Sequence, residues 1–198
     1  MSSVQKLQQW LLVIVLLIPF GSAWADWELD STQSAINFIS IKNDSVGEVH
    51  SFTSLAGSIG ATGKVQIVIN LNSVETLVEV RNERMRGLLF ETVTFPAAQI
   101  TARVDPTMLA AAVERGVITT SVPVTLALHG QEKKMTIAVM AVGEGDGSLR
   151  VFTPRPVIIN ASDFGLEKGV AALTTIAGLQ SISSAIPVTF DLQFTATP

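Results

Sequence analysis

The chain contains no cysteine, only two histidines and few charged residues. Without cysteine it forms no disulfide and carries no thiol nucleophile, so burial and hydrogen bonding must stabilise its fold. Charged residues make up 15% of the 198 residues, whereas about 25% is usual in a soluble domain. Hydrophobic residues make up 47%, which is too large a share for an intrinsically disordered chain. The composition therefore predicts a folded globular domain.

The signatures of catalytic and metal sites are also missing. The chain has no Gly-x-Ser-x-Gly elbow and no His-x-His or His-Glu-x-x-His motif, which are patterns of hydrolases and metal sites. A Ser–His–Asp arrangement assembled from separate strands stays open. We interpret His50 as a surface residue of a strand, and His129 as a polar-face residue that ends a strand before Gly130.

Basic residues are outnumbered in this chain. It has 13 Lys and Arg residues against 17 Asp and Glu residues, which gives a net charge of −4. Nucleic acids and anionic membrane surfaces attract proteins that carry a basic footprint. We therefore expect neither of them as a partner.

The sequence also lacks a long apolar run. Its longest, residues 10–20, has eleven residues, whereas a membrane-spanning helix needs about 18–20. This run follows Lys6 and precedes the small residues Ala23 and Ala25, which is the pattern of a secretory signal peptide. We predict that residues 1–25 are a signal peptide cleaved after Ala25. The exported, periplasmic protein would then be one domain, residues 26–198, without a transmembrane span.

The rest of the chain alternates apolar and polar residues repeatedly, most clearly in residues 186–194. Such alternation predicts strands with one apolar and one wetter face. The strand candidates are residues 65–71, 122–128, 135–139 and 186–194 and, more weakly, 34–41, 46–52, 98–104 and 149–151. Short turn-forming segments at 129–132 and 143–147 favour antiparallel pairing. About eight such strands fit an up-and-down barrel or a sandwich, and its interior would be either hollow or filled.

Three segments break the alternation and predict short helices. Residues 107–115 follow Asp105 and Pro106 and precede Gly116, so both ends of a helix are marked. Residues 162–179 indicate a loop followed by one or two helical turns. Residues 76–90 place Leu77, Arg81, Met85 and Leu88 on one helical face. An arginine on a buried face must extend to water, pair with an acid or contact an anionic ligand.

Five segments, in order, resemble the YceI-like family of polyisoprenoid-binding, lipocalin-like exported proteins. Residues 27–38 (WELDSTQSAINF) are similar to its aromatic-x-x-Asp and Ser-x-x-x-Phe opening, and 55–59 (LAGSI) to its Phe-x-Gly-x-Ile strand. Residues 72–96 resemble its central helix and the aromatic-Pro pair that follows. Residues 126–134 begin with LALHG, like its Leu-Thr-Leu-His-Gly hairpin, and 159–166 (INASDFGL) resemble its Asn-Arg-x-Asp-Phe-Gly signature.

The sequence departs from the family pattern at several charged positions. Residues 81–85 read RNERM where the family has Arg-Asp-x-His-Leu, and residues 88–91 read LLFE where it has Asp-Phe-Phe-Asp. Ala161 replaces the arginine that precedes Ser162. These departures affect the expected head-group contacts more than the expected fold.

The resemblance implies a mainly β fold: an exported, eight-stranded, antiparallel up-and-down barrel, lipocalin-like, with two or three short helices. It also implies non-catalytic binding or transport of a long-chain apolar lipid in a channel. The ligand would be a polyisoprenoid, a quinone tail or a fatty-acid-like molecule, with no metal or other cofactor. From motif matches we expect contacts from Phe38, Arg81, Phe90, Phe95, Asp163 and Phe164, and from periodicity Ile36, Phe52 and Leu89.

Other interpretations stay open at this point. Each apolar residue in that set could belong to an ordinary core, and Asp163 could simply favour the start of a helix. The protein could be an enzyme that acts on a lipid or quinone, with Asp163 or His129 as its base. It could also be an interaction module with a filled interior, and exposed apolar patches would favour a homodimer.

Overall fold

The computed structural model describes residues 25–197. The predicted signal peptide therefore lies outside the described residues, apart from Ala25, with which the first strand begins. Within the described part of the chain, eight antiparallel strands close into a barrel, because β11 pairs with both β9 and β1. The strands of this ring are β1 (Ala25–Lys42), β3 (Leu55–Gly60), β4 (Lys64–Asn70), β6 (Ala97–Arg103), β7 (Val117–Leu128), β8 (Gln131–Gly143), β9 (Leu149–Phe152) and β11 (Ala185–Ala196).

Three more strands extend the wall of the barrel beyond this ring. β2 (Val46–Phe52) pairs with the second half of β1, and β5 (Val74–Glu75) pairs in turn with β2. β10 (Val157–Asn160) pairs with the first half of β11. The chain thus passes round the barrel in order, as an up-and-down topology requires. The predicted barrel is confirmed, and the sandwich is excluded.

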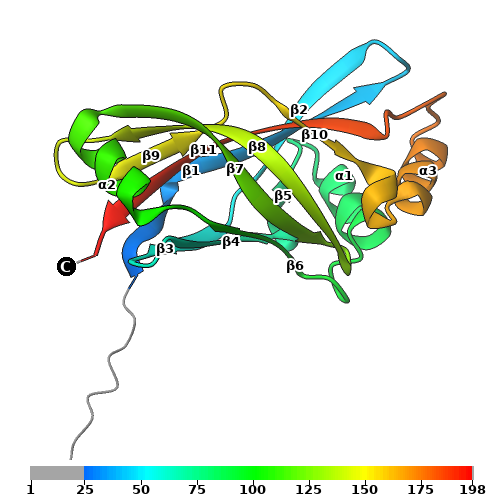
Figure 1. Cartoon of the computed structure of the whole chain (residues 1–198). Helices are drawn as coiled ribbons and strands as arrows, with labels where there is room; N and C mark the ends of the chain where they lie inside the picture. Colours follow the sequence, from blue (N-terminus) through cyan, green and yellow to red (C-terminus); the bar gives the residue numbers. More distant parts are fainter. Residues whose placement is uncertain (1–24, 198) are drawn as a thin grey trace, which may run out of the picture.

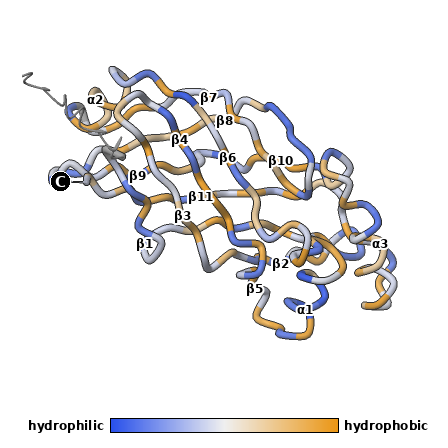
Figure 2. The backbone as a smooth tube through the Cα atoms, turned by 90° about the horizontal axis from the view of Figure 1, so that it is seen from below, coloured by the Kyte–Doolittle hydropathy of each residue, from blue (hydrophilic) through white to orange (hydrophobic). Residues whose placement is uncertain are grey.

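The strands follow the predicted alternation of side chains. Figure 2 shows apolar and polar segments succeeding one another along the barrel strands. β7 and β8 are joined by a turn of only two residues, His129 and Gly130, with φ angles of 51° and 74°. Positive φ at both central residues matches the tight turn that fits the twist of a hairpin.

Three short helices lie at the two ends of the barrel (Figure 1). α2 (Pro106–Arg115) packs on β7 and β8 at one end, and Asp105 caps it by accepting a hydrogen bond from the Thr107 amide. α1 (Glu79–Arg84) and α3 (Glu167–Ile176) lie at the opposite end. α1 continues into the π-helical turn η2 (Met85–Leu89), and α3 follows the 3-10 turn η3 (Ala161–Phe164). The short turn η1 (Leu71–Ser73) links β4 to β5.

The helix around residues 76–90 differs from its prediction. Leu77 is 90% exposed and Leu88 is 40% exposed, so neither lies on the buried face. Leu77 precedes the helix, which begins only at Glu79. In η2 the Phe90 amide donates to the Met85 carbonyl, and this five-residue spacing turns Phe90 instead of Leu88 inward, below Met85.

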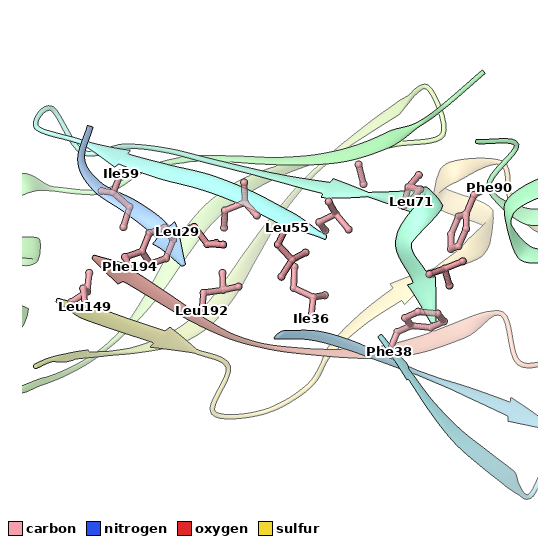
Figure 3. Close-up of a cluster of buried hydrophobic side chains, with 14 of the residues drawn as sticks. Leu29, Ile36, Phe38, Leu55, Ile59, Leu71, Phe90, Leu149, Leu192 and Phe194 are labelled. Atoms are coloured by element: carbon pink, nitrogen blue, oxygen red, sulfur yellow. The ribbon is translucent and has the colours of Figure 1, made fainter. Parts of the chain in front are cut away.

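Apolar side chains fill the barrel at the α2 end. Figure 3 shows Leu29, Ile59, Leu149 and Phe194 gathered there, with Phe38 and Phe90 at the other end of the same cluster. Leu149 and Phe194 are 0% and 1% exposed, and residues of α2 belong to this cluster. The barrel is therefore closed and packed at one end only.

Candidate ligand-binding cavity

A cavity of about 410 Å³ lies inside the barrel toward α1, η2 and α3. Most of its lining is aliphatic and comes from the inward positions of the strands, with further side chains from α3. Representative apolar lining residues are Ile69, Leu126, Ile137, Ile159, Leu173 and Val188. The cavity thus continues the apolar interior where core side chains no longer fill it.

The β1–β2 hairpin changes from apolar to polar along its inward face. Phe38 pairs with His50, and Ser40 pairs with Glu48. Since alternate residues of a strand share a face, the inward parity that begins with Ile36 continues through Ser40. These residues all line the cavity. One end of the cavity is therefore polar, and the sequence places that end near the turn of the hairpin.

Glu48 joins two cations at the polar end. Its Oε2 atom lies 2.6 Å from Lys42 Nζ and 2.5 Å from Arg81 Nη1. The hydrogen bond from Lys42, together with the charge of Arg81, lowers the pKa of Glu48. Arg81 also donates from Nη2 to the Thr76 carbonyl. Of the three alternatives left open for Arg81, the structure shows pairing with an acid, and Arg81 lines the cavity as well.

His50 is buried instead of lying on the surface, so our interpretation of it as a surface residue was wrong. It is 3% exposed, and its Nε2 atom lies 2.8 Å from Ser40 Oγ. Burial, with a smaller effect from the charge of Arg81, lowers the pKa of His50. At neutral pH the imidazole is therefore uncharged.

Asn82 ties the helix α1, which carries Arg81, to the segment that precedes it. Asn82 is 2% exposed, and its Oδ1 accepts hydrogen bonds from the amide and the hydroxyl of Thr76 at 2.9 and 2.6 Å. This asparagine stands at a position where the family pattern has an acid. An amide oxygen supplies the same acceptor without a charge, so the departure keeps the connection between Thr76 and α1.

α3 and η2 pack closely and cover this end of the barrel. A Cβ atom placed on Gly169 would lie 2.6 Å from the Leu88 carbonyl oxygen and 2.7 Å from Leu89 Cα. Only glycine permits so close an approach of the two backbones. Leu89 from η2 and Leu173 from α3 both line the cavity. Together these two elements form its helical cover.

The structure brings six of the nine predicted ligand-contact residues to the cavity. They are Ile36, Phe38, Phe52, Arg81, Leu89 and Phe90. The rings of Phe38, Phe52 and Phe90 follow one another, with centroid separations of 5.3 and 5.8 Å. They form a continuous aromatic strip on the wall.

The other three predicted residues lie elsewhere. Phe164 is 0% exposed in a separate apolar cluster with Leu126. Phe95 packs on the ring of His129 at a centroid distance of 4.4 Å. Asp163 forms an ion pair of 2.9 Å with Lys133, and both side chains are almost half exposed. Phe164 and Phe95 therefore serve in packing, and Asp163 forms a surface ion pair.

Sequence reasoning missed the polar lining of the cavity. Ser40, Lys42, Glu48 and His50 share the inward parity of Ile36 and Phe52. Continuing that parity past the last aromatic residue would have found them.

Among residues 25–197 no group of three or more His, Asp or Glu side chains could hold a metal ion. In the same residues no helix is long and apolar enough to cross a bilayer.

The model of the YceI-like domain family matches residues 27–194. The chain belongs to the YceI-like family. A polyisoprenoid-binding domain from Saccharophagus degradans, implicated in plant cell wall breakdown, is 38% identical, with a TM-score of 0.84. That similarity covers 88% of this chain and 100% of the other. The comparison with curated proteins gives no match.

Two more distant solved structures share the fold. BcnA from Burkholderia cenocepacia is 17% identical with a TM-score of 0.66, over 84% of this chain and 99% of its own. The YceI protein of Campylobacter jejuni is 16% identical with a TM-score of 0.53, over 75% of this chain and 84% of its own. At these identities the similarity concerns the barrel alone.

Proposed function

We propose that this YceI-like protein binds a long-chain apolar lipid in its cavity without chemically changing it. The observation that carries the proposal is an apolar cavity of about 410 Å³ inside a barrel whose other end is packed. Cavities that bind small molecules commonly measure about 300–1,000 Å³ and have mostly apolar walls with a few polar groups. The polar end around Glu48 supplies such groups.

The walls suit an alkyl or prenyl tail better than a compact polar molecule. Burying apolar surface contributes about 25 cal/mol per Å², and the aliphatic lining offers that contact along the cavity. The Saccharophagus domain, 38% identical, is a polyisoprenoid-binding domain. A polyisoprenoid, a quinone tail and a fatty-acid-like chain are the ligand classes that we propose.

We also propose that the protein is exported and acts in the periplasm. The charged, apolar and small-residue regions of residues 1–25 support this. A carrier for a water-insoluble chain would be useful in an aqueous space between membranes. The intact mass of the exported protein tests the proposal, because cleavage after Ala25 leaves a chain that starts at Asp26.

Native mass spectrometry of the exported form tests the binding function. We expect a fraction with a mass above that of the bare chain, and the difference should match a lipid recovered by solvent extraction. A bare chain mass from every expression host, with nothing in the extracts, would contradict lipid binding. That result would favour an interaction module.

A matched pair of variants on β6 provides the control. Ala98 is 2% exposed and lines the cavity, whereas its neighbour Gln99 is exposed on the other face of the strand. We expect Ala98→Trp to fill the cavity and abolish lipid retention, although overpacking costs about 1–3 kcal/mol of stability. Gln99→Trp adds the same side chain outside and should retain the lipid.

A second candidate function, an enzyme acting on a bound lipid, draws on the contact between Ser40 and His50. A serine 2.8 Å from a histidine is the start of a nucleophile–base pair. However, Nδ1 of His50 has no hydrogen-bond partner among the described residues to orient the ring. Asp163 and His129, the bases named from the sequence, do not line the cavity. Ester hydrolysis that is lost in Ser40→Ala, with binding retained, would favour the enzyme.

A further inference from the structure

A buried histidine stands where the apolar wall of the cavity meets its polar end. His50 is 3% exposed and lines the cavity. Its ring centroid lies 5.2 Å from that of Phe38, on the apolar side. On the other side are Ser40 and Glu48, the next inward residues of the two strands. A lipid whose tail follows the aromatic wall would bring its head group to this point.

The two ring nitrogens of His50 have different surroundings. Nε2 lies 2.8 Å from Ser40 Oγ, whereas Nδ1 is buried without a hydrogen-bond partner among the described residues. A buried polar atom without a partner is uncommon and costs free energy. The Nε atom of Arg81, which also lines the cavity, is likewise buried without a hydrogen-bond partner among the described residues. A small rotation of the His50 ring toward a ligand oxygen would satisfy Nδ1.

The protonation state of the His50 ring decides which groups it can bind. Burial lowers the pKa of His50, and the positive charge of Arg81 acts in the same direction. A neutral imidazole has one nitrogen that donates and one that accepts, and the hydroxyl of Ser40 can take either role. Nδ1 can therefore donate to a carbonyl oxygen or accept from a hydroxyl group.

The two cations whose charge acts on His50, Lys42 and Arg81, already share one acid. A carboxylate held at His50 would therefore compete with the Glu48 carboxylate for these two cations. Arg84 lines the cavity without an ion pair among the described residues. An anionic head group would bind at Arg84 instead.

We infer that His50 binds an uncharged oxygen atom, a carbonyl or a hydroxyl, of the lipid head group through Nδ1. The cavity then distinguishes lipids with such a head group from hydrocarbons of equal length and from carboxylates. This inference rests on the proposed function, because it names the head group of the same lipid.

Four probes that share one prenyl chain test this selectivity. They are the alcohol geranylgeraniol, the ketone geranylgeranylacetone, geranylgeranoic acid, and the corresponding hydrocarbon without oxygen. We expect His50→Phe to weaken binding of the alcohol and the ketone about five- to tenfold, the loss of one hydrogen bond. Affinity for the hydrocarbon and the acid should stay within about twofold. His50→Gln, which keeps an amide near the same place, should restore part of the affinity for the alcohol.

The ratio of affinities within one variant makes the test independent of stability. A variant that folds less well loses affinity for all four probes together, and the ratio between them does not change. An equal loss for the alcohol and the hydrocarbon in His50→Phe would overturn the inference. The inference would also be overturned if the acid bound most tightly of the four probes, lost affinity in His50→Phe and kept its affinity in Arg84→Gln.

Nitrogen-15 NMR gives a direct measurement, because the chain has only two histidines. With the ketone bound, the Nδ1 signal of His50 should show a protonated nitrogen. With the alcohol bound, the Nδ1 signal should also shift, because a hydroxyl can donate to this nitrogen or accept from it. A His50 Nδ1 signal that does not change when the ketone or the alcohol is added would contradict the inference. Failure of the wild-type protein to bind any probe, the hydrocarbon included, would overturn the proposed function together with the inference. Normal hydrocarbon binding without head-group selectivity would overturn the inference alone.

Discussion

Arg81 of α1 and Glu48 of β2 form an ion pair of 2.5 Å across the polar end of the cavity. The sequence alone leaves three partners open for this arginine: water, an acid or an anionic ligand. In the structure Arg81 pairs with an acid, Glu48, which is 33 residues away in the sequence. The pair also ties the helical cover to the wall of the barrel, since α1 continues directly into η2.

We expect the ion pair to contribute modestly to stability. The side chains of Arg81 and Glu48 are 27% and 33% exposed, so solvent screens their attraction, and such pairs contribute about 1 kcal/mol or less. A double-mutant cycle with Arg81→Met and Glu48→Gln, followed by urea unfolding, measures the coupling free energy. Glu48→Gln should cost more than Arg81→Met, because Lys42 also loses its partner. A coupling of zero at low salt would contradict the geometry.

Gly169 gives a sharper prediction about the helical cover. In Gly169→Ala the new methyl group would meet the backbone of Leu88 and Leu89, which cannot move aside as a flexible side chain would. We expect a loss of about 1–3 kcal/mol in the free energy of unfolding, larger than the gain of about 1 kcal/mol in helix propensity. Displacement of α3 should also speed the exchange of bound lipid, measured by transfer to vesicles.

Gly87 is the matched control for this substitution. It lies in η2 next to the same contact, yet a Cβ on it would meet nothing within 4 Å. Gly87→Ala should therefore be neutral or stabilise the protein by up to about 1 kcal/mol. Equal effects of Gly87→Ala and Gly169→Ala would show that the close approach has no energetic role.

The barrel was predictable from the sequence because its strands are long and alternate regularly. Residues 186–194 lie within β11, and residues 122–128 lie within β7. The short β10 escaped prediction, because Val157, Ile158 and Ile159 are all apolar and show no alternation. β3 was found only through the resemblance of residues 55–59 to a family strand. Local pattern thus predicts the long strands, and the closure of the ring comes from pairing between β1 and β11.

The cavity was only half predictable. Phe38 and Phe90 came from motif matches, and both line it. The sequence could not reveal that Phe164 and Phe95 pack elsewhere, because an apolar side chain fits a core and a ligand wall equally well. The burial of His50 was missed for the opposite reason. A polar residue on an inward position is interpreted as exposed unless its hydrogen-bond partner, here Ser40, is known.

The packed and the hollow ends of the barrel should respond differently to truncation. Leu149 is 0% exposed in the packed end, so Leu149→Ala leaves a void and should cost about 2–5 kcal/mol. Ile137 already faces the cavity, so Ile137→Ala loses fewer contacts and should cost less. Urea unfolding compares the two variants. Lipid affinity should fall in Ile137→Ala and stay unchanged in Leu149→Ala, and the reverse order would contradict a cavity at this end.

Mild acid should destabilise the protein through His50. Burial lowers the pKa of this histidine in the folded state below its ordinary value of 6.5. As the pH falls below 6.5, the unfolded chain binds a proton at His50 that the folded protein does not. The stabilisation is therefore fully present above pH 6.5 and is lost as the pH falls toward the folded pKa. The slope for one proton is at most about 1.4 kcal/mol per pH unit.

His50→Phe isolates this contribution from that of the carboxylates. The hydrogen bond from Lys42 lowers the pKa of Glu48 below its ordinary value of 4.5, so the stability linked to this acid is lost only at lower pH. Between the ordinary pKa values of histidine, 6.5, and of Glu48, 4.5, we expect a difference between the two proteins. As the pH falls through this range, the free energy of unfolding should decrease less steeply in His50→Phe than in the wild-type protein. Above pH 7 the free energy of unfolding should depend on pH in the same way in the two proteins. Urea unfolding at a series of pH values measures the difference, and identical slopes below pH 6.5 would show that His50 does not stay neutral in the folded protein.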